Sequence, residues 1–442
     1  MEALKEWKGK KNRKPLIIRG ARQVGKSYLV RLFGSECFQR VVEINFEKNP
    51  ERAELFFGND PAETIRLLEM EFNISIKLEN TLLFLDEIQA ASGVLSSLRY
   101  FYEEMPDIHI IAAGSLLEFV LEEHTFSMPV GRIEYLYIGP FSFEEFLLGM
   151  GEIRLVNYIQ DYSLESAVAA SIHNKLLKYI SIFFFTGGMP EAIALFKEEE
   201  SYRQVDMVKE SIISTYYDDF GKYGNRIDQH RLRKLFRKIP TVVGQKFKYA
   251  NIDREERSKD MKRALHMLCN ARIVSPVYHS SCNGLPLGAE INDRLFKVIY
   301  LDIGLMCSIC GLDPARLKDS DKLMLINSGA VCEQFIGQHL LFSSDCYKGP
   351  ELYYWAREQR NSSAEVDFVI AEIGRIVPVE VKAGKTGTMK SLHLFMHEKK
   401  SDLALRFDTN PPSIFKGSFR LISLPLYLVG QTRRIIRELQ LI

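Results

Sequence analysis

The stretch GARQVGKS, residues 20–27, has the spacing G-x-x-x-x-G-K-[ST] of a phosphate-binding loop. It follows the apolar run PLIIR and precedes the amphipathic run KSYLVRLFG, so we expect it to join a buried strand to a helix. Glycine lets the backbone wrap closely around phosphate, and the loop amides and the helix N-terminus then hold the negative charge. The residues expected to contact a nucleotide are Gly20, Ala21, Arg22, Gln23, Val24, Gly25, Lys26 and Ser27. The alternative is a chance match in a glycine-bounded turn.

A bound triphosphate carries a magnesium ion, and the sequence offers a second, acidic element to hold it. We expect Lys26 to reach the β and γ phosphates of ATP and the Ser27 hydroxyl to bind Mg²⁺. The apolar run in TLLFLDEI delivers Asp86 to the carboxyl end of a buried strand, where it would be the second magnesium-binding residue. Glu87, beside it, would polarise the attacking water as a general base. Helix capping is the alternative role for these two acids.

Two further residues are candidates for contact with the γ-phosphate. Ser115 ends the next apolar strand, IIAAGS, where it would act as a phosphate sensor or as the N-cap of the following helix. Arg132, in VGRIEYLYIGP, would meet the phosphate of its own chain or of a neighbouring one, as arginine fingers do. Pairing with surface carboxylates is the alternative for Arg132. The sequence leaves both roles open.

A second set of charged residues lies in EVDFVIAEIGRIVPVEVK, residues 365–382. Strand alternation puts Asp367, Glu380 and Lys382 on one face of an expected hairpin. The opposite, apolar face is expected to contain Val366, Phe368, Ile370, Val377, Val379 and Val381. If Ile373 and Gly374 form a two-residue loop, counting outward puts Asp367 opposite Glu380. A loop shifted by one residue puts Asp367 opposite Lys382 instead, and a bulge breaks the arrangement.

These residue types suit metal-dependent phosphodiester hydrolysis. Asp367 and Glu380 would share a divalent cation, and Lys382 would position or activate the attacking water. The pattern is similar to the D...E-x-K signature of restriction-type nucleases, in which a helix often adds another acid, and Glu333 in GAVCEQF is placed to do so. The alternative is an exposed cross-strand ion pair between Asp367 and Lys382 with a solvated Glu380.

Length and composition limit what these motifs can mean. A chain of 442 residues exceeds the size at which one core keeps growing, so two or three domains are expected. The net charge of +1 implies that contact with nucleic acid comes from a local patch. No run approaches the ~18 apolar residues of a membrane span, and the N-terminus is charged, so we expect a cytoplasmic protein without membrane contact. Cys307 and Cys310 are expected to be small hydrophobes in a helix.

The pattern of apolar runs predicts an α/β fold in four parts. Residues 1–150 alternate strands and helices, which is typical of a P-loop parallel sheet with flanking helices. Residues 151–224 are expected to be a helical connector, broken at Gly187, Gly188 and Pro190. Two helices and a strand pair make residues 225–318 winged-helix-like. Residues 319–442 form a second expected α/β module.

Basic residues are concentrated on one expected helix of the winged-helix-like region. Clusters of this kind hold the backbone phosphates of DNA, whereas a solvated basic face is the common alternative. The residues are Arg226, Arg231, Arg233, Lys234, Arg237 and Lys238.

Together these motifs resemble a prokaryotic family of predicted AAA+-type ATPases with a C-terminal domain of uncharacterised function. The resemblance runs through nearly the whole chain and rests on RKPLIIRGARQVGKS, INFE, LLFLDEIQ, AAGS, GRIEYLYIGPFSFEEF, FFFTGGMPEA, KVIYLDIGL and VDFVI followed by VPVEVK. It implies an ATP-binding core and a C-terminal restriction-endonuclease-like fold. Many ATPases of this class form rings, so a homo-oligomer is also a candidate state.

Two functions are therefore expected from the sequence. In the first, an ATPase with ATP and Mg²⁺ as cofactors is coupled to a C-terminal domain that binds or cuts DNA. In the second, ATP controls association with DNA or with a protein, and the nuclease-like domain is inert.

Overall fold

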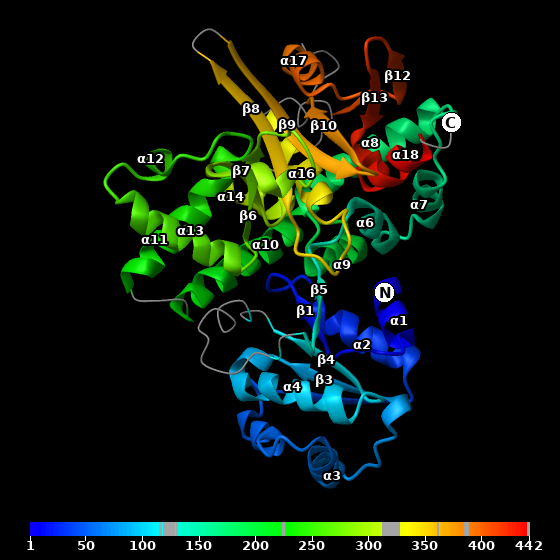
Figure 1. Ribbon diagram of the computed structural model, residues 1–442, viewed down its shortest axis with the longest axis vertical. Helices are drawn as coiled ribbons and strands as arrows, with labels where there is room; N and C mark the ends of the chain where they lie inside the picture. Colours follow the sequence, from blue (N-terminus) through cyan, green and yellow to red (C-terminus); the bar gives the residue numbers. More distant parts are fainter. Residues whose placement is uncertain are drawn as a thin grey trace. The chain divides into compact units, whose positions relative to one another are not determined.

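The computed structural model describes residues 1–114, 117, 129, 131–222, 226–311, 328–359, 362–383 and 389–439. The chain divides into two compact units. The first contains residues 1–139 with the short segments 270–272 and 345–349. The second contains residues 140–269, 273–344 and 350–442. Figure 1 shows the elements of each unit coloured along the chain.

The first unit is built on a parallel sheet of five strands, in the order β2-β3-β4-β1-β5. Its strands are β1 (Leu16–Arg19), β2 (Arg40–Asn45), β3 (Thr81–Asp86), β4 (His109–Ala113) and β5 (Glu134–Tyr137). All five strands expected from the sequence are present, and the parallel sheet is confirmed. Since parallel strands share a direction, their carboxyl ends lie along one edge, where ligands of open α/β sheets bind.

Helices cover both faces of this sheet. They are α1 (Glu2–Gly9), α2 (Lys26–Cys37), α3 (Pro61–Phe72) and α4 (Ser92–Glu104). On β3, Leu82 and Phe84 belong to the apolar cluster with α1 and α2. Leu83 and Leu85 belong to the cluster with α3 and α4. Because strand side chains alternate, Asp86 is in step with Leu82 and Phe84 and faces α2.

The second unit begins with helices (Figure 1). They are α6 (Phe143–Gly149), α7 (Ile153–Gln160), α8 (Ala170–Thr186), α9 (Pro190–Glu199), α10 (Tyr202–Asp219), α11 (Arg226–Lys238), α12 (Tyr249–Ile252), α13 (Ser258–Asn270) and α14 (Ile303–Ile309). The predicted break between α8 and α9 is confirmed. Gly187 has φ +71°, and a Cβ there would lie 2.1 Å from a carboxylate oxygen of Asp302, so only glycine fits.

An eight-stranded sheet forms the rest of this unit, in the order β12-β13-β11-β10-β9-β8-β6-β7. Its strands are β6 (Val274–Ser280), β7 (Ile291–Tyr300), β8 (Leu352–Gln359), β9 (Ser362–Glu372), β10 (Arg375–Val381), β11 (Leu403–Asp408), β12 (Ser413–Lys416) and β13 (Arg420–Pro425). The predicted strand pair before residue 318 is β6 and β7, but β6 also pairs in parallel with β8. The sheet therefore crosses the boundary expected at 318–319 and joins β6 and β7 to the C-terminal strands.

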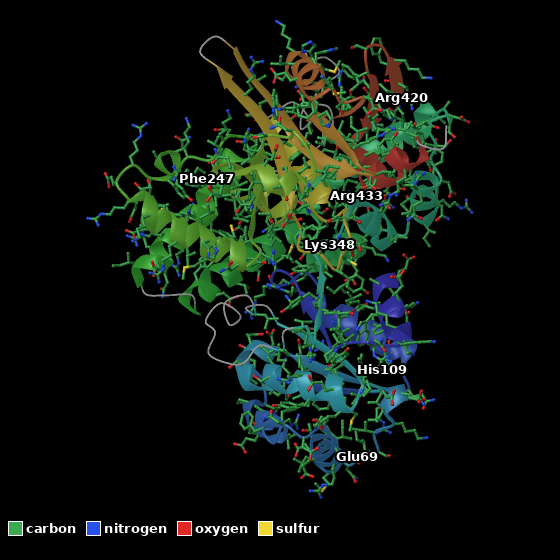
Figure 2. The ribbon with its side chains drawn as sticks, viewed as in Figure 1. Glu69, His109, Phe247, Lys348, Arg420 and Arg433 are labelled. Atoms are coloured by element: carbon green, nitrogen blue, oxygen red, sulfur yellow. The ribbon has the colours of Figure 1, made fainter. Side chains whose placement is uncertain are left out.

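Three more helices pack on this sheet or at its end. They are α16 (Ser328–Leu341), α17 (Lys390–Lys399) and α18 (Thr432–Glu438). Gly337 lets α16 approach closely, because a Cβ there would lie 2.5 Å from Ile299 and 2.8 Å from Phe368. On α18, Arg433 (Figure 2) donates to the buried carboxylate of Glu372 at 2.5 Å. These contacts fix α16 over the sheet and α18 at the end of β9.

Two smaller expectations also concern these elements. Cys307 is buried within α14, as expected, whereas Cys310 directly follows that helix and is half-buried. Across the described ranges, no helix is both long and apolar enough to cross a membrane.

Candidate nucleotide site and C-terminal charge cluster

The loop between β1 and α2 has the conformation that its glycines permit. Gly25 is the N-cap of α2 with φ +91°, a value that favours glycine, and Gln23 also has a positive φ of 63°. At Gly20 a Cβ would lie 2.5 Å from the backbone oxygen of Ile138. The two glycines of the motif are thus required by geometry, and the loop leads directly into the N-terminus of α2.

Lys26, the first residue of α2, lies under this loop. Lys26 is only 7% exposed. Its Nζ atom donates to the backbone oxygens of Gly20 at 3.0 Å and Ala21 at 2.7 Å. Burial lowers the pKa of Lys26 to about 8, and the charges of Glu87 and Asp86 oppose this shift. The ammonium group thus rests on neutral carbonyls, and a polyanion would be a stronger partner.

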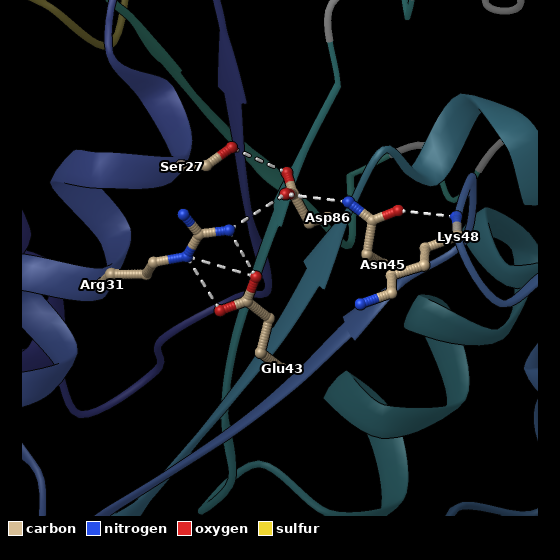
Figure 3. A network of polar contacts seen from close by, with 6 residues as sticks. All are labelled: Ser27, Arg31, Glu43, Asn45, Lys48 and Asp86. Carbon is tan, nitrogen blue, oxygen red and sulfur yellow. Dashed lines mark hydrogen bonds and ion pairs between the residues drawn. The ribbon is translucent and has the colours of Figure 1, made fainter.

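Ser27 and Asp86 meet at the carboxyl end of β3, as Figure 3 shows. The Ser27 hydroxyl donates to Asp86 Oδ1 at 2.9 Å. Burial raises the pKa of Asp86, and the hydrogen bond from Ser27 opposes that rise. The structure therefore brings together the two residues that the sequence predicts as magnesium ligands.

Neighbouring side chains fix the orientation of Asp86 (Figure 3). Asn45, the residue paired with Asp86 across β2 and β3, donates to Asp86 Oδ2 at 3.3 Å. The Asn45 Oδ1 atom accepts from Lys48 N at 2.9 Å, so the amide nitrogen is the one that faces Asp86. Arg31 binds Glu43 through two nitrogens, with Nη2 at 2.7 Å from Oε1. Sequence reasoning missed Asn45, although INFE ends the strand beside LLFLDEI.

Glu87 directly follows β3 and has a left-handed backbone conformation, with φ 49°. Its Oε2 accepts a 2.5 Å hydrogen bond from Gln89 Nε2. Gly114, at the end of β4, leaves room for Gln89, since a Cβ there would lie 2.0 Å from Gln89 Oε1. Because Glu87 also raises the pKa of Lys26, the general-base candidate lies within electrostatic reach of the loop. The sequence analysis did not predict a role for Gln89. Its position two residues after Glu87 in LDEIQ is the signal that would have indicated one.

The residues present fit ATP and Mg²⁺. The loop depends on glycine at Gly20, and Lys26 has no carboxylate among its hydrogen-bond partners in the described part of the chain. Ser27 and Asp86 are oxygen donors, which Mg²⁺ prefers, and phosphate oxygens and water would complete its coordination.

The structure does not bring Arg132 to this site. Arg132 precedes β5 and therefore lies at the amino edge of the parallel sheet, whereas the loop follows the carboxyl end of β1. Its Nε donates to Glu103 Oε1 at 2.8 Å, which is the surface pairing that the sequence left as the alternative. Contact with a neighbouring chain stays a prediction. Ser115 lies outside the described residues.

The hairpin of β9 and β10 has the predicted two-residue loop. Ile373 and Gly374 both have positive φ, at 49° and 69°, as a type I′ turn requires. Glu372 pairs with Arg375, and the ladder continues to Phe368 and Val379. The ladder stops one pair before Asp367 and Glu380, so the predicted register is confirmed only up to that point.

The strict alternation expected along β9 is wrong, because the pairing of β8 with β9 shifts register beside Asp367. Tyr353 pairs with Val369 and Trp355 with Val366, so two residues of β9 face one of β8. Val366 and Val369 consequently pack in the same apolar cluster with α17. Asp367 Oδ2 accepts a 2.7 Å hydrogen bond from the backbone N–H of Val381.

The predicted acids converge around a lysine that sequence reasoning missed. Lys297 Nζ, from β7, lies 2.7 Å from Glu333 Oε1, 2.6 Å from Glu365 Oε1 and 3.8 Å from Asp367 Oδ1. Lys382 Nζ pairs with Glu380 Oε1. We call Lys297, Glu333, Glu365, Asp367, Glu380 and Lys382 the C-terminal charge cluster. KVIYLD shows a lysine before an apolar run, but nothing in the sequence relates it to residues 333–382.

Burial dominates the electrostatics of this cluster. It raises the pKa of Glu333 to about 7, which the charge of Lys297 opposes, and it raises the pKa of Glu380 to about 7 together with the charge of Asp367. Burial alone would lower the pKa of Lys297, but the charges of Glu333, Asp367 and Glu365 reverse this and hold it above its ordinary value. In the described part of the chain, no group of three or more His, Cys, Asp or Glu residues could hold a metal ion. Lys297 lies 3.8 Å from Asp367, and binding of a divalent cation by Asp367 and Glu380 stays a prediction.

The basic helix α11 is partly neutralised within its own unit. Arg231 binds Glu256 at 2.8 Å and Asp260 at 3.3 Å, and Lys234 pairs with Asp253. Residues 233, 237 and 238 of the same helix are exposed. The side chain of Arg226 lies outside the described residues. Of the patch residues whose side chains the structure describes, three are thus exposed.

Comparisons with known proteins agree with the first unit. Residues 12–147 match a family described as an AAA domain. Residues 178–316 and 328–427 match two domains of unknown function, DUF8612 and DUF4143. No curated protein is significantly similar in sequence.

Three solved structures are weakly similar. The Walker-type ATPase PABY2304 of Pyrococcus abyssi has 15% identity and a TM-score of 0.45, with 70% of this chain and 94% of that chain covered. The ORC2 protein of Aeropyrum pernix has 13% identity and a TM-score of 0.32, with 70% and 90% covered. A DNA replication initiation factor has 17% identity and a TM-score of 0.24, with 61% and 85% covered. These TM-scores are too low to carry an argument.

The glycine loop, the parallel sheet and the family match at residues 12–147 agree with one another. Residues 12–147 thus have a P-loop α/β fold and are similar to the AAA domain family.

Proposed function

We propose that the chain is a Mg²⁺-dependent ATPase whose reaction takes place in the first unit. The observation that carries the proposal is the meeting of Lys26, Ser27 and Asp86 at the carboxyl edge of the sheet. Burial removes the competing water that would otherwise solvate these groups, so charge interactions with a nucleotide are strengthened there.

Each residue has a separate task in this proposal. The loop amides and the N-terminus of α2 bind the phosphates, and Lys26 exchanges its carbonyl partners for phosphate oxygens. Ser27 and Asp86 hold Mg²⁺, which neutralises charge on the phosphates. Glu87 accepts the proton of the attacking water, and Gln89 orients the Glu87 carboxylate through the 2.5 Å hydrogen bond.

Steady-state hydrolysis of ATP tests the proposal. Lys26→Ala is expected to lower kcat/KM by at least about 100-fold, because it removes a charged donor to the phosphates. Lys48→Ala is the matched control, since Lys48 is exposed and its contact with Asn45 is made by the backbone. Full turnover in Lys26→Ala, with Lys48→Ala also active, would show that the nucleotide site is elsewhere.

For the second unit we infer ATP-controlled binding to DNA without cleavage. Two observations support this reading over a nuclease. Lys297 lies among the carboxylates that a catalytic metal would need, and Arg233, Arg237 and Lys238 are exposed on α11. The alternative reading keeps Asp367, Glu380, Lys382 and Glu333 as a metal-dependent site for phosphodiester cleavage.

Two assays on the full chain separate these readings. We expect the anisotropy of a fluorescent duplex to change with ATP and to fall in a triple variant of Arg233, Arg237 and Lys238 to Ala. Supercoiled plasmid with Mg²⁺ or Mn²⁺ is expected to stay intact. Cleavage by the wild type that disappears in Asp367→Ala would establish the nuclease instead, and ATP-dependent binding to protein alone would replace DNA as the partner.

A further inference from the structure

Lys297 occupies an unusual position for a lysine, because its ammonium group is buried among acids from two other elements. The residue is 1% exposed. Glu333 is on α16, Glu365 and Asp367 are on β9, and all three carboxylates lie within 4 Å of Nζ. A buried ammonium group needs such partners, and these partners equally need a cation.

The surrounding structure fixes this arrangement from several sides. On α16, Gln334 exchanges two hydrogen bonds with the backbone of Tyr300, at 2.9 and 2.7 Å, which pins the helix beside β7. Phe247 (Figure 2) donates its backbone N–H to the oxygen of Phe296 at 2.8 Å, next to Lys297. Gly244 lies against Glu333, where a Cβ would be 2.8 Å from Oε2. The carboxylate of Glu333 therefore has little freedom to turn away from Lys297.

One acid of the cluster retains an unused oxygen. Glu380 is 5% exposed, and its Oε2 is buried without a hydrogen-bond partner among the described residues. Its other oxygen binds Lys382, and its carboxylate is close enough to Asp367 for their charges to interact. An unpartnered buried carboxylate oxygen is costly, and it is a ligand that a divalent cation would accept.

We propose that Lys297 fills a divalent-cation site of the C-terminal charge cluster, so that the site is closed to metal while Lys297 is present and opens when its charge is removed. Four carboxylates then face two lysines, Lys382 beside Glu380 and Lys246 at 3.9 Å from Glu365 Oε2, and a hard cation such as Mn²⁺, Mg²⁺ or Ca²⁺ restores the balance of charge. This inference goes beyond ATP hydrolysis, which uses none of these residues.

The proposal is tested by measuring Mn²⁺ binding to the nucleotide-free full chain. Electron paramagnetic resonance detects the free Mn²⁺ that remains in solution. All proteins carry Asp86→Asn, which weakens metal binding at the nucleotide site. With Lys297 intact, we expect no site that depends on Asp367. With Lys297→Met, we expect one bound Mn²⁺ per chain, with an affinity at least about tenfold higher than that of any Mn²⁺ bound by the protein with Lys297 intact, which is about 1.4 kcal/mol. Adding Asp367→Asn should abolish that site.

Matched variants keep the test decisive. Lys297→Arg retains a positive charge and should bind no Mn²⁺ in the cluster. If Lys297→Met does not fold, Lys297→Gln takes its place, and the same bound Mn²⁺ is expected. Far-ultraviolet circular dichroism checks folding in each case. An Asp367-dependent Mn²⁺ site in the protein with Lys297 intact would overturn the proposal, and so would a folded Lys297→Met protein without such a site. Either outcome is independent of whether ATP is hydrolysed.

Discussion

The two units each contain a buried lysine near acidic side chains, but the lysines differ in what they bind. Lys26 donates hydrogen bonds to two backbone carbonyls. The carboxylates of Asp86 and Glu87 are close enough to affect its pKa, but among the described residues neither accepts a hydrogen bond from it. Lys297 is in direct contact with the carboxylates of Glu333 and Glu365. Neutral carbonyls do not neutralise the positive charge of a lysine, so an anionic ligand can still pair with it. Carboxylates neutralise that charge within the protein. The same residue type therefore indicates a ligand site in one unit and an internal ion pair in the other.

If ATP hydrolysis depended on acids of the second unit, the proposed difference between the two lysine sites would be wrong. Glu87→Gln is expected to lower kcat about 10²–10⁴-fold with little change in KM, because it removes a general base but no phosphate contact. Glu380→Gln, the matched change in the charge cluster, should leave kcat unchanged. The measurement is steady-state ATP hydrolysis, and the account fails if the two variants exchange these results.

Lys297→Met should destabilise the second unit by up to about 3 kcal/mol, since it leaves half-buried carboxylates without their cation. Trp355 packs in the apolar cluster of that unit, so its fluorescence in a Trp7→Phe background follows urea unfolding. Arg375→Met is the control, because Arg375 forms an exposed pair with Asp402 at 3.5 Å. Equal stability of Lys297→Met and the wild type would show that the cluster needs no internal cation.

The pH dependence of the first unit reports on a different buried group. Burial lowers the pKa of His109 (Figure 2) from 6.5 to about 4, so the folded unit holds this histidine neutral. The unfolded chain binds the proton more readily between these values, and stability should fall as the pH drops from about 6.5 through 4. Trp7 lies 6.0 Å from the His109 ring and reports unfolding in a Trp355→Phe background. In His109→Gln this part of the acid dependence should be reduced, and an unchanged profile would assign it to other groups.

The smallest effect is expected for Arg132. Its bond to Glu103 is exposed and at the edge of the sheet away from the loop, so Arg132→Ala should change kcat of the dilute chain by less than about twofold. Hydrolysis measured over a range of protein concentrations checks this. A loss that appears only at concentrations where the wild type associates would instead support contact with a neighbouring chain.

The first unit could be predicted well because its signals are local. The motif at residues 20–27 and the run that ends at Asp86 each specify a strand end, and parallel pairing then brings those ends together. Asn45 and Gln89 were missed because their contacts depend on strand order and on the turn after β3. The role of Arg132 could not be decided from the sequence, since an arginine near a sheet can lie at either edge.

The second unit was harder because its contacts join distant segments. The turn at Ile373 and Gly374 follows from local sequence, but the register shift beside Asp367 depends on pairing with β8. The pairing of β6 with β8 likewise joins residues on both sides of the boundary expected at 318. Lys297 precedes the hairpin by about 70 residues, so no spacing rule could place it among the acids.

Calorimetric titration of the nucleotide-free chain with ATP and Mg²⁺ tests the central claim most directly. We predict uptake of one nucleotide per chain, lost in Lys26→Ala and retained in both Lys48→Ala and Lys297→Arg. Absence of adenine nucleotide binding at millimolar concentration, in protein shown to be folded, would contradict the account.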